Sequence, residues 1–134
     1  MRFWQRMKLE HHRRRMLAVP ICCACLGFGS LLASCQSPWI ACTIVNRQAS
    51  PVSLVQVSYP GGSFGVQTIA PNATFRYRFH ALSTDKLSVE FTDAAHTDHT
   101  VTGPELAQGQ EGSLAIAIEP GNRVTWTPDL KRAK

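Results

Sequence analysis

Apolar and polar side chains alternate along most of the sequence after residue 38, and this period of two constrains the fold more than any other feature. In the segment TFRYRFH, aromatic residues alternate with basic ones: Phe75, Tyr77 and Phe79 with Arg76, Arg78 and His80. Successive side chains of a β-strand point to opposite faces, so such a segment has one core face and one solvent face. No comparable 3.6-residue period appears, and we therefore expect strands rather than helices.

Eight strands are expected, separated by short segments rich in Gly, Pro, Asn, Asp and Ser. Their ranges are 39–46, 52–59, 64–69, 73–80, 86–92, 98–102, 113–119 and 122–127. Strands with one apolar face must bury it against a second sheet, which predicts an all-β, immunoglobulin-like antiparallel β-sandwich of about seven or eight strands. The longest link, TGPELAQGQEGS, is expected to hold a turn of helix or to cross between the sheets.

The first 34 residues lack this alternation and carry the whole net charge of +5. Six basic residues and one acidic residue precede Cys35, whereas eight of each sign follow from Cys35 onward. The basicity belongs to the leader, so the sequence favours no nucleic-acid partner. A basic segment, residues 1–15, precedes an uncharged apolar segment, residues 16–34, that ends in small residues. This order is typical of an export signal.

Leu32-Ala33-Ser34-Cys35 closes the apolar segment and resembles the lipobox of bacterial lipoproteins. The resemblance implies diacylglycerol transfer to the Cys35 thiol and signal cleavage between Ser34 and Cys35. It also implies a lipid-anchored location in the bacterial cell envelope, and Gln36 favours the outer membrane, facing the periplasm. The expected organisation is a signal peptide over 1–34, a lipidated tether over 35–38, the sandwich over 39–128 and a basic tail over 129–134.

Two other roles for the leader stay open. The apolar segment has 19 residues, close to the roughly 20 that an uncleaved transmembrane anchor needs. An ordinary secretory cleavage before Cys35 would place Leu32 where a small residue is preferred. For Cys42 we expect a buried structural thiol. A disulfide between Cys35 and Cys42 is the alternative, and it would exclude lipidation.

Three groups of residues are candidate sites. The first is a partner-binding loop with two aromatic residues at its ends, formed by Tyr59, Pro60, Gly61, Gly62, Ser63 and Phe64. A plain hairpin whose aromatic rings turn inward explains this loop equally well. The second is a polar face of Arg76, Arg78 and His80, suited to a carboxylate or phosphate. Glu90 on an adjacent strand is the simpler partner expected for it.

The third group lies in DAAHTDH, where His96 and His99 are weak candidates for metal ligands beside Asp93 and Asp98. The mature segment has no nucleophile-elbow motif, glycine-rich phosphate loop or paired-cysteine motif. We therefore expect no enzyme, no metal site and no cofactor beyond the acyl lipid on Cys35.

The expected function is that of a membrane-anchored envelope lipoprotein whose sandwich acts as a binding or adaptor module. Its partners are the lipid bilayer, through Cys35, and another envelope protein. A structural or pilot subunit of an envelope complex is the main alternative. A small metal-dependent hydrolase or metal-binding protein that uses His96 and His99 is a further one.

Overall fold

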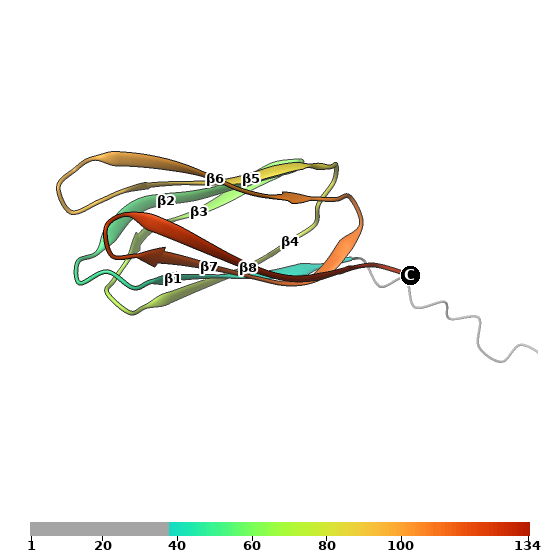
Figure 1. Cartoon of the computed structure of the whole chain (residues 1–134), viewed down its shortest axis with the longest axis horizontal. Coiled ribbons are helices and arrows are strands. Elements are labelled where there is room, and N and C mark those ends of the chain that lie inside the picture. The colour runs from blue at the N-terminus through green and yellow to red at the C-terminus, as the bar shows by residue number, and fades with distance from the viewer. Residues whose placement is uncertain (1–37) are drawn as a thin grey trace, which may run out of the picture. The chain divides into compact units, whose positions relative to one another are not determined.

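The fold is that of a computed structural model, which describes residues 38–134 (Figure 1). The expected signal peptide, its expected cleavage site and Cys35 lie outside these residues. The described part of the chain is all strand, turn and loop, and it has no helix that is long and apolar enough to span a membrane.

Within residues 38–134, eight strands form two four-stranded sheets, stacked as two layers in Figure 1. The strands are β1 (Ile40–Asn46), β2 (Val52–Tyr59), β3 (Gly62–Ile69), β4 (Thr74–Phe79), β5 (Asp85–Thr92), β6 (Asp98–Leu106), β7 (Gln110–Glu119) and β8 (Arg123–Arg132). One sheet has the order β4-β1-β7-β8 and the other the order β3-β2-β5-β6. The all-β sandwich expected from the alternation is confirmed.

Five of the six strand pairings are antiparallel, and β1 and β7 pair in parallel. The expected sandwich is therefore antiparallel except at the centre of one sheet, where Ile44 lies opposite Ile116. A hairpin turn forces its two strands to run antiparallel, but five strands separate β1 from β7 along the chain. This long connection leaves the direction of the pair free, so a parallel pairing is possible here.

The last three strands are longer than expected. β6 continues through Gly103 and Pro104, because it is an edge strand, where proline's missing N–H donor is tolerated. The link before β7 therefore crosses between the sheets and contains no turn of helix. β8 runs to Arg132 through an antiparallel register with β7, so residues 129–132 are strand and not a tail.

The core lies between the sheets and is built from the alternating apolar residues. In β5 the inward residues are Leu87, Val89 and Phe91, and in β7 they are Leu114, Ile116 and Ile118, all buried as expected. β4 departs from the expected pattern. Phe79 is buried, but Phe75 is only partly buried and Tyr77 is 40% exposed, since β4 lies at the edge of its sheet.

Aromatic side chains close both sides of the sandwich. On the side of β3 and β4, the Phe64 ring stacks on Tyr77 with centroids 4.2 Å apart, and Tyr59 stacks on Phe79 at 4.3 Å. On the side of β6 and β8, the Trp126 ring lies against Gly103, where a Cβ atom would come within 2.7 Å of the ring. These contacts join the edges of two sheets that share no backbone ladder.

Candidate functional site

The loops of the sandwich gather at two opposite ends (Figure 1). The proximal end, where the described chain begins, consists of residues 38–39, 60–61, 80–84, 107–109 and 133–134. Backbone hydrogen bonds tie it together, from Gly112 N to Trp39 O, from Leu82 N to Pro60 O and from Ala133 N to Gly109 O. The distal end consists of the loops 47–51, 70–73, 93–97 and 120–122. It is the end furthest from residue 38.

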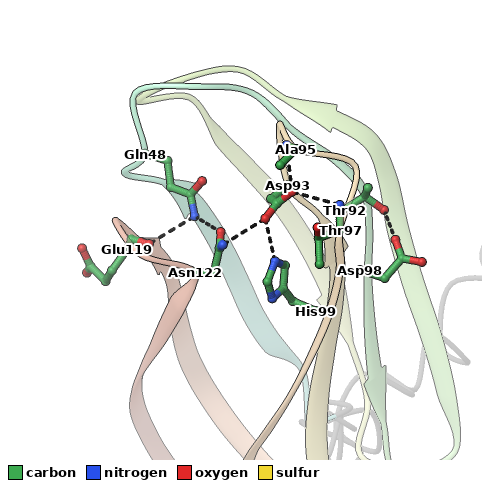
Figure 2. A network of polar contacts seen from close by, with 9 residues as sticks. All are labelled: Gln48, Thr92, Asp93, Ala95, Thr97, Asp98, His99, Glu119 and Asn122. Carbon is green, nitrogen blue, oxygen red and sulfur yellow. Dashed lines mark hydrogen bonds and ion pairs between the residues drawn. The ribbon is translucent and has the colours of Figure 1, made fainter.

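A polar network at the distal end centres on Asp93 (Figure 2). Its Oδ1 accepts hydrogen bonds from the backbone N–H groups of Ala95, at 2.9 Å, and Thr97, at 3.0 Å. Its Oδ2 accepts one from Asn122 Nδ2 at 3.0 Å and lies 2.8 Å from His99 Nε2. Gln48 Nε2 donates to Asn122 Oδ1 at 2.8 Å. The network therefore joins the β1–β2, β5–β6 and β7–β8 loops.

The hydrogen bond with His99, and next the backbone bond from Thr97, lower the pKa of Asp93 from 3.8 to about 2. The carboxylate is only 12% exposed, and its two oxygens share four polar partners. A general acid or base needs a pKa near the working pH and a free face toward a substrate. Asp93 has neither, so its arrangement is that of a structural link.

A shallow depression of about 330 Å³ adjoins this network. Its lining includes Gln48, Asp93, Pro120 and Asn122. The side chains of Gln48, Asp93 and Asn122 already bond to one another, and the depression is open to solvent. Sites for small molecules enclose most of their ligand. This geometry is suited to a contact surface rather than to an enclosed substrate site.

The two histidines proposed as weak metal candidates do not converge. His96 is exposed at the tip of the β5–β6 hairpin with φ of 60°, and its N–H bonds to Asp93 O at 3.0 Å. His99 pairs with Asp93, while Asp98 accepts from Thr92 Oγ1 at 2.6 Å. Among residues 38–134, no three His, Cys, Asp or Glu side chains come together as a metal would require.

The candidate loop from Tyr59 to Phe64 has its aromatic rings turned inward. Phe64 is only 7% exposed, Tyr59 is partly buried and Pro60 is buried. Both rings stack on aromatic residues of β4, so they make core contacts and are shielded from solvent. The segment is therefore the plain hairpin with inward rings and not a loop that presents aromatic residues. Its exposed tip is Gly61, Gly62 and Ser63.

The expected polar face on β4 is changed by the way the strands pair. β4 pairs with β1, whereas Glu90 lies on β5 in the other sheet, so the expected pairing of Glu90 with the β4 arginines is wrong. The reason is that the chain changes sheets between β4 and β5. Arg76 lies opposite Thr43. Arg78 and His80 instead flank Trp39 at the proximal end.

Leu54 is a candidate residue that the sequence analysis missed. It is 57% exposed and has φ of 51°, at an irregularity in the β2–β5 register between Ser53 and Gln56. Two shallow depressions of about 310 and 520 Å³ share it as a lining residue. Two consecutive apolar residues, Leu54 and Val55, break the alternation of β2, and this break was the available signal.

Cys42 is buried and free, as expected of a structural thiol. Burial raises its pKa from 9.0 to about 12, which keeps the thiol protonated at neutral pH. The alternative disulfide would involve Cys35, which lies outside the described residues.

Comparisons with known proteins show no family for this chain. No protein-family model matches it, and neither does any curated protein. Among solved structures, it is similar to the NMR structure of a protein from Eubacterium rectale, with 17% sequence identity and a TM-score of 0.49. That match covers 66% of this chain and 86% of the other. A likeness at this level carries no functional argument.

Proposed function

We propose that this chain is a bacterial envelope lipoprotein, anchored through diacylglycerol on Cys35, whose sandwich is a binding or adaptor module for another envelope protein. The lipobox-like sequence after a basic and an apolar segment supports the anchor. Within residues 38–134, Asp93 is already bonded to His99 and Asn122, and the depression beside it is shallow. Both observations favour a contact surface over a catalytic site.

The observation that carries the binding role is the conformation of Leu54. A non-glycine residue in the left-handed region costs about 1–2 kcal/mol. Here the conformation lets Val52 and Val55, three residues apart, both face the core, and it turns the Leu54 side chain into solvent. Bulges re-aim side chains, and strained residues concentrate where a protein binds or reacts.

The surroundings of Leu54 match the anatomy of a small protein interface. Its neighbours on the outer face of the β3-β2-β5-β6 sheet are polar and include Gln56, Gln67 and Glu90. One apolar anchor within a polar rim is the usual arrangement of a contact centre. We therefore place the partner surface on this face, with Leu54 entering an apolar pocket of the partner.

The anchor is tested by the intact mass of the full-length protein expressed in a bacterial host, beside a Cys35→Ser variant. We expect wild-type protein that begins at Cys35 and carries diacylglyceryl mass, and a variant that keeps residues 1–34. Wild-type protein that retains the leader, or that carries no lipid, would contradict the anchor.

The binding role is tested by cross-linking in intact cells, followed by purification of the lipoprotein and identification of its partner. We expect Leu54→Asn to lose the partner, since asparagine keeps the backbone conformation and removes the apolar side chain. Thr127→Asn is the control, because it places the same side chain at an exposed strand position of the other sheet, away from both Leu54 and the proximal end. A partner retained by both variants would rule out the Leu54 surface.

A further inference from the structure

Three side chains contact one another at the proximal end, where the described chain begins. The rings of Trp39 and His80 have centroids 3.6 Å apart, and Arg78 Cζ lies 5.0 Å from the centroid of the Trp39 ring. His80 Nδ1 lies 2.9 Å from Pro38 O. Trp39 is 41% exposed despite these contacts. An indole that these contacts hold in place, and that stays partly exposed, has lost side-chain freedom before any partner arrives.

A second large apolar side chain is exposed at the same end. Leu82 lies two residues beyond His80 and is 62% exposed. Its N–H donates to Pro60 O at 3.0 Å, which fixes the 80–84 loop against the β2–β3 turn. Four large apolar residues of the described chain are strongly exposed, and Trp39 and Leu82 are the two at this end.

The short connection to Cys35 identifies what covers this end. Trp39 follows Cys35 by four residues, and a fully extended chain spans about 3.3–3.6 Å per residue, or roughly 14 Å in all. Acyl chains on Cys35 lie in the hydrocarbon layer, so this tether holds Trp39 close to the lipid headgroups. Tryptophan favours that layer because one part of the ring is apolar and its N–H is polar.

We propose that the proximal end docks on the bilayer that holds Cys35, with Trp39 and Leu82 in the headgroup layer and Arg78 against lipid phosphates. This inference rests on the proposed lipid anchor. Docking gives the domain one orientation, because two apolar contacts and a cation add to the single covalent tether. The distal loops then face away from the membrane.

The test uses full-length lipidated protein reconstituted into phosphatidylethanolamine–phosphatidylglycerol vesicles that contain a lipid brominated high on its acyl chain. Cleavage before Cys35 leaves Trp39 and Trp126 as the tryptophans of the processed chain. Trp126→Phe therefore reports Trp39, and Trp39→Phe reports Trp126 as a matched control. We expect about two-fold quenching of Trp39 and a blue shift of its emission, with little change at Trp126. Leu82→Asp in the Trp126→Phe background should weaken the quenching.

Intact mass, measured on the same samples, separates the two proposals. Protein that carries lipid and shows selective quenching of Trp39 supports the docked end. Protein that carries lipid but shows equal quenching of the two tryptophans overturns the docking and leaves the anchor standing. If Trp39 is shielded from aqueous acrylamide but is not quenched by the brominated lipid, the docking proposal is overturned, and a bound protein covers Trp39 instead. Protein without lipid on Cys35 overturns the anchor and this inference together.

Discussion

At the scale of single residues, Asn46 combines full burial with complete hydrogen bonding. Its Nδ2 donates to Ser50 O at 2.9 Å and Ile69 O at 3.0 Å, and its Oδ1 accepts from Gln48 N at 2.9 Å. Asn46→Ala removes all three bonds and leaves polar backbone groups without this partner. We expect the free energy of unfolding to fall by about 2–4 kcal/mol, measured by urea denaturation.

The partly buried Gln48 provides the comparison. Gln48→Ala removes two hydrogen bonds that its side chain donates near the surface, to Glu119 O and to Asn122 Oδ1. Its expected loss is about 1 kcal/mol. Equal losses in the two variants would show that burial adds nothing to the cost at Asn46.

For Leu54 we expect a substitution to stabilise the fold, because leucine is strained in the left-handed conformation at this position. Leu54→Asn relieves the left-handed strain without emptying the core, so we expect the free energy of unfolding to rise by about 0.5–1 kcal/mol. Leu54→Val should lower it by about 1 kcal/mol, because a β-branched residue tolerates this region poorly. Chemical denaturation measures both, with Leu82→Asn as the exposed-leucine control. A destabilised Leu54→Asn variant would show that the leucine stabilises the fold.

At the scale of elements, the sequence predicted the strands but not how they pair. The alternation in β5 and β7 depends only on neighbouring residues, so it is visible in the sequence. The pairing of β4 with β1, and of β1 with β7, depends on segments far apart in the chain. Glu90 was misplaced for this reason. The candidate site was harder still, because the inward turn of Phe64 and the bulge at Leu54 depend on those pairings.

The closed side between β6 and β8 allows an element-scale prediction. Gly103→Ala would place a Cβ atom 2.7 Å from the Trp126 ring, which is partly buried and packed on the core. We expect the two edges to separate slightly, with a loss of about 1–3 kcal/mol and a red shift of Trp126 emission. Thr102→Ala, at an exposed position of the same strand, is the control and should change little. Wild-type stability of Gly103→Ala would mean that this edge is loosely packed.

At the scale of the whole molecule, the two ends of the sandwich have different chemistry. The proximal end exposes Trp39 and Leu82, whereas the distal end holds a network of polar side chains around Asp93. Strand ladders run within each sheet but not between the sheets. The contact of Asp93 with Asn122 therefore adds a polar link between the β5–β6 loop of one sheet and the β7–β8 loop of the other.

This link predicts how the stability of the whole domain depends on pH. The pKa of Asp93 falls from 3.8 to about 2 on folding, so its charge stabilises the folded state above pH 4. That contribution is lost as the pH falls from about 4 to 2, where the folded state also takes up the proton.

Urea denaturation of wild type and Asp93→Asn between pH 2 and 7 should give free energies of unfolding that differ above pH 4 and converge toward pH 2. His99→Gln removes the largest cause of the lowered pKa and should narrow this window. A difference between wild type and Asp93→Asn that is the same at pH 2 and pH 6 would show that the ionised carboxylate does not stabilise the distal end.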